Sequence, residues 1–219
     1  DTIEGGTGAD ALAGGVGDDT ITGGADADTI TGGAGDDTLT GGADSDVAIF
    51  AGNQADYTFE SSSDGLTITV RDVAGSFTDT VTEVETLRFS DGDISVSHDG
   101  NTLVLTGADG VTDHIKVVGT HPVTIKGMGS SDTLTGGAGA DTLHGDAGTD
   151  TLSGGNGNDR LFGGDGADTL DGGAGSGDEV DYSSDNVSGN TYGVNVNLYN
   201  GVATDGYGKQ DTLVNVEDV

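Results

Sequence analysis

Apolar and polar positions recur with a period of nine residues over two stretches of the chain. The first stretch, residues 1–49, contains five full copies from Gly5, and the second, residues 127–181, contains six from Gly127, the last with one extra residue. In each copy, an apolar-centred run such as Thr38-Leu39-Thr40 follows an Asp and precedes a glycine-rich segment. This pattern predicts a short strand at the seventh to ninth places, whose middle side chain points inward.

The inward residues of successive strands form two columns of aliphatic side chains. Because each copy supplies only one of them, the predicted core is a thin ladder between two parallel sheets. The columns consist of Leu12, Ile21, Ile30 and Leu39 in the first stretch and Leu134, Leu143, Leu152, Leu161 and Leu170 in the second.

The first six places of each copy predict a tight turn. Glycine at the first, second and fourth places permits a positive φ, and the sixth-place Asp puts a carboxylate at the turn exit. Asp26 and Asp44 replace the fourth-place glycine, and we expect them to adopt the left-handed conformation with some strain. Met128 and Ser130 make the first turn of the second stretch imperfect, and the extra residue in the last copy moves its carboxylate to Asp178.

Residues outside the two stretches lack the period and are rich in Val, Ile, Thr, Tyr and Phe. We predict strands at 56–60, 66–71, 80–89, 102–106, 114–118 and 122–126, with hairpin turns at Asp64-Gly65, Asp99-Gly100 and Asp109-Gly110. Such antiparallel segments would cap the open ends of the repeat stretches, which otherwise expose strand edges and apolar side chains.

The predicted fold is therefore all-β, with two parallel β-roll blocks separated and capped by antiparallel β segments. The expected segments are 1–50 for block one, 51–126 for the strand insert or cap, 127–181 for block two and 182–219 for a β flank. Because residue 1 lies inside a repeat and the flank resembles segments that lead into a further block, we expect a longer natural chain. Asn186-Val187-Ser188 matches a glycosylation acceptor, which we interpret as a chance match.

The large excess of acidic residues indicates that the folded chain needs bound cations. The chain of 219 residues has 43 Gly, and its 39 Asp and Glu residues face six Lys and Arg, giving a formal net charge of −33. Ordered carboxylates in register with glycine need a compact counter-charge, which a divalent cation supplies. The lack of a basic patch argues against nucleic acid and anionic membrane surfaces as partners. The absence of Cys excludes thiolate metal sites.

The repeated unit Gly-Gly-x-Gly-x-Asp-x-U-x, where U is aliphatic, resembles the RTX (repeats-in-toxin) family of calcium-binding repeats. This resemblance implies that two copies form one turn of a right-handed β-roll, and that calcium ions lie between turns. Carbonyls of the second and fourth places and the Asp of one copy would face carbonyls of the first and third places and the Asp two copies later. About eight ions would bind, and a mid-block residue such as Asp28 would bridge two of them.

Residue by residue, the resemblance assigns metal ligands in both blocks. In block one they are Asp1, Gly6, Gly8, Asp10, Gly15, Gly17, Asp19, Gly23, Gly24, Ala25, Asp26, Asp28, Gly32, Ala34, Asp37, Gly41, Ala43 and Asp46. In block two they are Met128, Ser130, Asp132, Gly137, Gly139, Asp141, Gly145, Asp146, Ala147, Gly148, Asp150, Gly154, Gly155, Asn156, Gly157, Asp159, Gly163, Asp165, Asp168, Gly172, Ala174 and Asp178.

Catalytic motifs are not found. The sequence has no zinc-protease motif, serine elbow or phosphate-binding lysine loop, and no Glu closes an EF-hand loop begun at Asp26. Adjacent acids such as Asp36-Asp37 are explained by the repeat, since one member is a sixth-place residue. We therefore expect no enzyme activity, catalytic residue or organic cofactor.

The expected function is a calcium-binding scaffold module of a secreted RTX protein. The resemblance implies export by a type I secretion system of a bacterium, folding on calcium outside the cell, and a place in a large adhesin-like protein at the cell surface. One alternative is a non-catalytic module of a secreted protease, lipase or alginate epimerase. Another is an adhesin domain that binds ice, carbohydrate or a cell-surface ligand, for example through the Thr array of Thr20, Thr22, Thr38 and Thr40.

Overall fold

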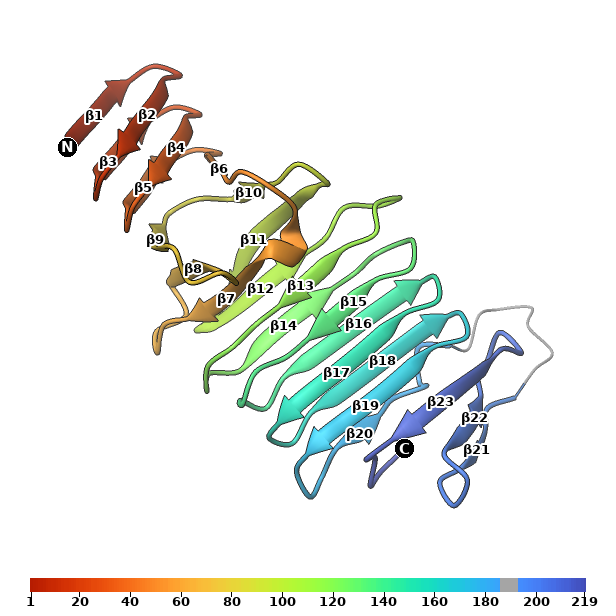
Figure 1. Cartoon of the computed structure of the whole chain (residues 1–219). Helices are drawn as coiled ribbons and strands as arrows, with labels where there is room; N and C mark the ends of the chain where they lie inside the picture. The colour runs from red at the N-terminus through yellow and green to blue at the C-terminus, as the bar shows by residue number, and fades with distance from the viewer. Residues whose placement is uncertain (186–192) are drawn as a thin grey trace. The chain divides into compact units, whose positions relative to one another are not determined.

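The computed structural model describes residues 1–185 and 193–219, so Asn186-Val187-Ser188 lies outside the described residues. Internal contacts divide the chain into two units, Asp1–Leu103 and Val104–Val219. Over the described residues, both units are built of strands, with one short 3-10 turn, η1 (Gln54–Asp56), in unit 1 (Figure 1). No helix in the described part of the chain is long and apolar enough to cross a membrane. The four predicted segments remain a sequence-based division.

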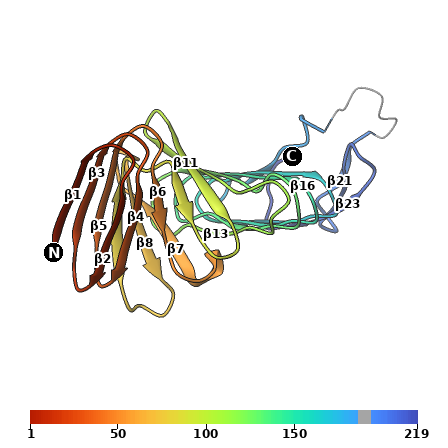
Figure 2. The same ribbon diagram turned by 90° about the horizontal axis from the view of Figure 1, so that it is seen from above.

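Unit 1 begins with a parallel β-roll, whose turns can be followed from red to orange in Figure 1 and from above in Figure 2. Alternate strands join two parallel ladders, β1-β3-β5 and β2-β4-β6. Paired residues such as Thr20 and Thr38 are two copies apart, so two copies make one turn of the roll. The strands are β1 (Thr2–Thr7), β2 (Ala11–Val16), β3 (Thr20–Ala25), β4 (Thr29–Ala34), β5 (Thr38–Ala43) and β6 (Val47–Ile49).

The strands of the roll are longer than predicted. Strands β1 to β5 each have six residues and continue through the first three places of the next copy. Pairing continues there because the second- and third-place residues find partners two copies on, as in Gly6 with Gly24 and Thr7 with Ala25. The prediction of three-residue strands was therefore wrong, since it treated the glycines only as turn residues.

An antiparallel segment follows the roll in unit 1. Strands β7, β8 and β9 pair antiparallel, and β9 then joins β5 in parallel, while β10 joins β6 in parallel and pairs antiparallel with β11. The Asp64-Gly65 hairpin is confirmed between β7 and β8. A single strand over 80–89 was wrong, because the chain turns at Glu83, which has φ 52, and enters the other sheet. These strands are β7 (Tyr57–Ser61), β8 (Thr67–Asp72), β9 (Thr78–Thr82), β10 (Thr86–Arg88) and β11 (Asp93–Asp99).

Strand β12 (Thr102–Thr106) contains the division between the units, and the roll of unit 2 follows it. One ladder has the order β14-β16-β18-β20, and the other has the order β13-β15-β17-β19-β23-β22-β21. The strands are β13 (His114–Lys116), β14 (Val123–Lys126), β15 (Thr133–Thr135), β16 (Thr142–Ala147), β17 (Thr151–Asn156), β18 (Arg160–Asp165), β19 (Thr169–Ala174), β20 (Glu179–Val180), β21 (Asn195–Asn197), β22 (Val202–Thr204) and β23 (Gln210–Val214).

Residues 107–126 belong to the roll of unit 2. Strands β13 and β14 pair in parallel with β15 and β16, with Ile115 opposite Leu134 and Ile125 opposite Leu143. Since β12 and β13 lie in different sheets, Asp109-Gly110 forms a roll turn, and its prediction as a hairpin turn was wrong.

The predicted aliphatic columns form the core of both rolls. Ile21, Ile30 and Leu39 are completely buried, as are all five leucines predicted for block two. Leu12 is only half-buried, because β2 is the first strand of its sheet. Each fully buried Leu or Ile contributes roughly 1.5–3 kcal/mol, which is opposed by the cost of ordering a glycine-rich chain. The core alone therefore gives the rolls little net stability.

Candidate metal sites

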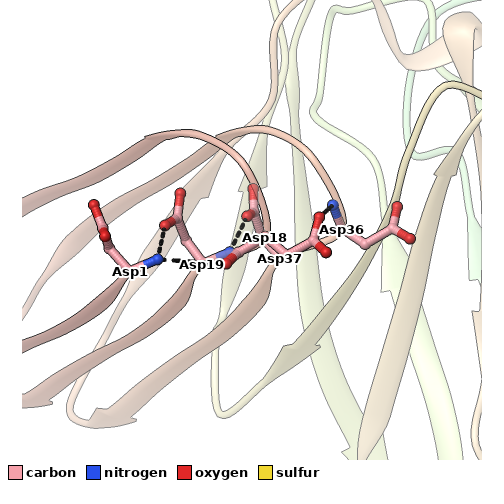
Figure 3. A network of polar contacts seen from close by, with 5 residues as sticks. All are labelled: Asp1, Asp18, Asp19, Asp36 and Asp37. Carbon is pink, nitrogen blue, oxygen red and sulfur yellow. Dashed lines mark hydrogen bonds and ion pairs between the residues drawn. The ribbon is translucent and has the colours of Figure 1, made fainter.

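The sixth-place Asp side chains form a regular line of hydrogen bonds along each roll. Asp28 Oδ1 accepts a hydrogen bond from the Asp10 backbone N–H at 2.8 Å, and the Asp28 N–H donates to Asp46 Oδ1 at 2.8 Å. The same bond joins Asp19 to Asp37 in block one. Figure 3 shows this pair together with Asp18 and Asp36, where the Asp36 N–H donates to Asp18 Oδ1 at 3.0 Å. In block two the bond between sixth-place residues joins Asp132 to Asp150, Asp141 to Asp159 and Asp150 to Asp168.

The second oxygen of nearly every one of these carboxylates is buried without a partner. These Oδ2 atoms accept no hydrogen bond from any described residue. An anionic oxygen removed from water without a partner costs several kcal/mol, and a bound cation removes that cost. The residues fit a divalent cation for this reason. The atoms are the Oδ2 oxygens of Asp10, Asp19, Asp28, Asp37, Asp46, Asp132, Asp150, Asp159, Asp168 and Asp178.

Asp141 and the first residue of the chain complete the line with small differences. Asp141 Oδ2 accepts a hydrogen bond from the Gly137 N–H at 2.7 Å, so this carboxylate is held at both oxygens. The terminal nitrogen of Asp1 donates to Asp19 Oδ1 at 2.5 Å, so Asp1 occupies a sixth place.

The first-place glycines have a different role from the one predicted. Positive φ angles occur at second-place residues such as Gly24 (119°) and Gly33 (122°), and not at the first place. A Cβ atom added to the first-place Gly32 would lie 2.2 Å from Asp37 Oδ2. The first-place glycine is therefore needed to leave room for the buried carboxylate. The prediction of positive φ at this place was wrong.

The backbones of turns that are two copies apart are packed closely against one another. A Cβ atom on Gly24 would lie 2.2 Å from the Gly6 carbonyl oxygen, and one on Gly35 would lie 2.5 Å from the Gly17 carbonyl oxygen. Second- and fourth-place carbonyls thus lie against the turn two copies later. In the opposite direction, the Ala34 carbonyl oxygen accepts a hydrogen bond from the Gly17 N–H at 2.7 Å. The two facing carbonyl sets implied by the resemblance remain a prediction.

The irregular copies keep the same turn geometry. Asp26 and Asp44 adopt φ angles of 75° and 79°, as expected, and Met128 and Ser130 also have positive φ. Asp178 Oδ1 accepts a hydrogen bond from the Asp159 N–H at 2.9 Å with a spacing of 19 residues. The extra residue of the last copy is therefore absorbed in the loop, and Asp178 takes the sixth place.

Four acids that the sequence analysis missed continue the line into the flanking segments. Asp79 Oδ1 and Asp211 Oδ1 accept hydrogen bonds from the N–H groups of Asp37 and Asp168, at 2.9 Å and 3.0 Å. Glu85 Oε2 and Glu217 Oε2 accept hydrogen bonds from the N–H groups of Asp46 and Asp178, at 2.8 Å and 3.0 Å. Both pairs belong to a motif, Asp-Thr-(Val or Leu)-x-x-Val-Glu, at 79–85 and 211–217. The motif lacks glycines, which is why a search for the repeat passes over it.

A fifth missed acid lies before block two. The Asp113 N–H donates to Asp132 Oδ1 at 2.8 Å, and Asp113 Oδ2 accepts a hydrogen bond from the Ala108 N–H at 2.9 Å. A Cβ atom on Gly107 would lie 2.1 Å from that Oδ2. Gly107 and Asp113 therefore act as first- and sixth-place residues of a copy lengthened by one residue.

Burial makes four carboxylates of this line resist ionisation in the metal-free chain. Loss of solvent raises the pKa of Asp79 and Asp168 to about 7 and that of Asp132 and Asp159 to about 6, with neighbouring carboxylates adding to the effect. A cation between the turns would favour the charged forms instead.

The arrangement as a whole defines a class of site. Within residues 1–185 and 193–219, no three His, Asp or Glu side chains are grouped to hold a metal ion. The oxygens close to the turns are those of single carboxylates and of backbone carbonyls. Hard oxygen ligands of both kinds are those that calcium prefers. The fold and its buried carboxylates therefore define a cation-binding parallel β-roll.

Comparison with known proteins agrees with this class. A family model for the RTX calcium-binding nonapeptide repeat matches four copies, at residues 1–30, 13–48, 124–152 and 144–178. The two repeat blocks of this chain are thus members of the RTX family of calcium-binding repeats.

No curated protein matches the chain. Among solved structures, the chain is similar to the extracellular lipase LipA from Serratia marcescens, with 21% identity over 97% of this chain and a TM-score of 0.37. The chain spans 37% of the length of that lipase, and a likeness at this level gives no basis for an inference about activity.

Proposed function

We propose that this chain is a structural module whose two β-rolls fold when calcium binds, in a protein that a bacterium secretes. The line of buried, unpartnered Oδ2 oxygens carries this proposal. In the absence of a cation, these carboxylates repel one another and lack the water that would solvate them. The narrow aliphatic core does not offset that cost together with the entropy of a glycine-rich chain.

Dependence on calcium would make folding of the chain depend on whether it is inside or outside the cell. An ion that binds only the folded state stabilises it by about 2.7 kcal/mol when its concentration is a hundred times the dissociation constant. Several sites along one roll add such contributions, so millimolar calcium outside a cell folds a chain that stays unfolded inside it. This behaviour suits export as an unfolded chain by a type I secretion system, followed by folding at the cell surface as a spacer in a large adhesin-like protein.

Circular dichroism of the full chain with and without calcium tests the proposal. Addition of calcium should produce the β-sheet signal and a cooperative melting transition, and chelation should abolish both. Magnesium is the matched control, because its smaller shell of near-octahedral ligands does not suit carbonyl-rich loops. A β-sheet signal and a melting temperature that do not respond to chelation would refute calcium-coupled folding.

The outward threonines of unit 1 suggest a second candidate function. Thr20 and Thr38 are paired neighbours, and the row continues to Thr2 and Thr80 on β1 and β9. Regular threonine rows on a flat sheet are the feature expected of an ice-binding surface. A measurement of thermal hysteresis in the presence of calcium would decide, and its absence would leave the row as ordinary strand surface.

A further inference from the structure

The two units end their rolls with the same arrangement of strands. In each, three strands pair antiparallel and the last joins the edge of the roll in parallel, as β9 joins β5 and β23 joins β19. The last strand carries the Asp-Thr-(Val or Leu)-x-x-Val-Glu motif in both units. Positions in the two segments therefore correspond. Phe50 and Tyr182 each follow the last sixth-place Asp of their roll, Asp46 or Asp178, by four residues.

An Asp closes the turn before the last strand in both units. Asp72 Oδ1 accepts hydrogen bonds from the N–H groups of Ser76 and Phe77, at 2.6 Å and 2.9 Å. Asp205 Oδ1 accepts hydrogen bonds from the N–H groups of Tyr207 and Lys209, at 3.0 Å and 2.6 Å. Asp72 and Asp205 thus each hold the turn before the last strand by accepting two backbone hydrogen bonds.

The space behind these turns is filled by different chemistry in the two units. In unit 1, Tyr57 lies 5.2 Å from Phe89, 5.7 Å from Phe50 and 6.0 Å from Phe77, measured between ring centroids. Asp72 stays partly exposed beside this aromatic cluster. The aromatic cluster fills the space behind this turn of unit 1 with buried apolar side chains.

Unit 2 has carboxylates in the corresponding region. Asp185 is 2% exposed, and Asp205 and Asp211 are completely buried. Asp211 Oδ2 accepts a hydrogen bond from the Tyr182 hydroxyl at 2.9 Å. The Oδ2 oxygens of Asp185 and Asp205 are buried and accept no hydrogen bond from the described residues. Neither carboxylate has an ion-pair partner among the described Lys, Arg and His side chains.

Two observations place Asp185 and Asp205 close together. A Cβ atom on Gly206, the residue after Asp205, would lie 2.3 Å from the Asp185 carbonyl oxygen, so the two loops are packed tightly. The same Cβ position would lie 2.8 Å from the Asp185 Cβ, so the Asp185 side chain starts beside this loop. Neither residue has a place in the nine-residue repeat.

We propose that Asp185 and Asp205 bind one calcium ion outside the repeats, and that this ion closes unit 2 as the aromatic cluster closes unit 1. Two carboxylates without nitrogen or sulfur ligands suit a hard cation, and calcium accepts water and backbone oxygens in its remaining positions. The ion neutralises two oxygens that have no other counter-charge, and it ties the loop after β20 to the turn before β23.

The number of calcium ions bound to the full chain tests this site. Native mass spectrometry at saturating calcium should show one ion fewer in Asp185→Asn and in Asp205→Asn than in the wild type. Asp72→Asn is the matched control in unit 1 and should keep the wild-type number. Asn retains Oδ1, so the turn hydrogen bonds at Asp205 persist and circular dichroism should remain native. An unchanged number in both unit 2 variants would overturn the proposal.

Terbium luminescence gives a second measurement that does not depend on the folding of the Asn variants. Terbium replaces calcium, and Tyr182, whose hydroxyl donates a hydrogen bond to Asp211 Oδ2, would sensitise its emission. Tyr182→Phe keeps both proposed ligands and should lose part of the sensitised emission, and unchanged emission would overturn the site.

The proposed function and this inference fail separately. A wild-type chain that binds no calcium would refute both. A wild-type chain that binds calcium in the repeats, with the same number of ions in the Asp185→Asn and Asp205→Asn variants, would refute the additional site alone.

Discussion

Two adjacent acids in one loop of block one allow a proposed metal ligand to be compared with a surface charge. Asp37 is 1% exposed, whereas its neighbour Asp36 is exposed. Both carboxylates accept one backbone hydrogen bond at Oδ1, Asp37 from Asp19 at 2.8 Å and Asp36 from Thr78 at 2.7 Å. Only Asp37 has a second oxygen that is buried without a partner. Asp37→Asn and Asp36→Asn therefore remove the same charge and differ only in the proposed site.

The expected effects differ by at least an order of magnitude. Two unit charges 4 Å apart interact by about 4 kcal/mol at an effective dielectric constant of 20, and an exposed pair contributes about 0–1 kcal/mol. Loss of the Asp37 carboxylate should therefore cost at least about 1.4 kcal/mol of calcium binding, which is a tenfold weaker affinity. In the metal-free chain, Asp37→Asn should be neutral or stabilising, because it removes a buried charge whose pKa burial raises.

A calcium titration followed by circular dichroism measures both effects. The midpoint should move at least tenfold higher for Asp37→Asn and stay within about twofold for Asp36→Asn. Equal shifts for the two variants would show that calcium responds to net charge rather than to the buried oxygen, and would refute the reasoning.

Further predictions concern the turn, the core and pH. Gly24→Ala should raise the calcium midpoint more than Gly6→Ala, because both have positive φ but only the Gly24 Cβ would meet a carbonyl oxygen, at 2.2 Å; equal shifts would contradict the role of that carbonyl. Leu152→Ala should lower the stability of the calcium-bound chain by about 2–5 kcal/mol in denaturant melts, since this side chain is completely buried; a loss below 1 kcal/mol would contradict the ladder as the core. The pKa values of Asp79 and Asp168 are raised to about 7, so the folded metal-free chain binds more protons than the unfolded chain as pH falls from about 7 to about 4. Residual β structure without calcium should therefore increase as pH falls from 7.5 to 5, while calcium affinity decreases over the same interval, and the opposite trends in dichroism and titration would contradict this assignment.

Much of the roll could be predicted from the sequence, because each copy pairs with the copies two places before and after it, at a constant spacing along the chain. The nine-residue period predicted the buried column of Ile21, Ile30 and Leu39, and it identified the sixth-place acids as the chemistry of the turns. Substitutions within the period were also predictable, since Asp26 keeps the left-handed turn. These features depend on local conformation and on a fixed spacing along the chain.

The tertiary structure alone decided what lies beyond the period. Asp79 joins the line of carboxylates because β9 pairs with β5 after an intervening hairpin, and no local pattern indicates that pairing. The role of the first-place glycine became clear only from the position of Asp37 Oδ2 beside Gly32. Asp185 and Asp205 are 20 residues apart in sequence and are brought together by packing of the flank. Periodic contacts are encoded in spacing, whereas contacts across an inserted segment depend on which strand edges and loops remain to be covered once the roll has formed.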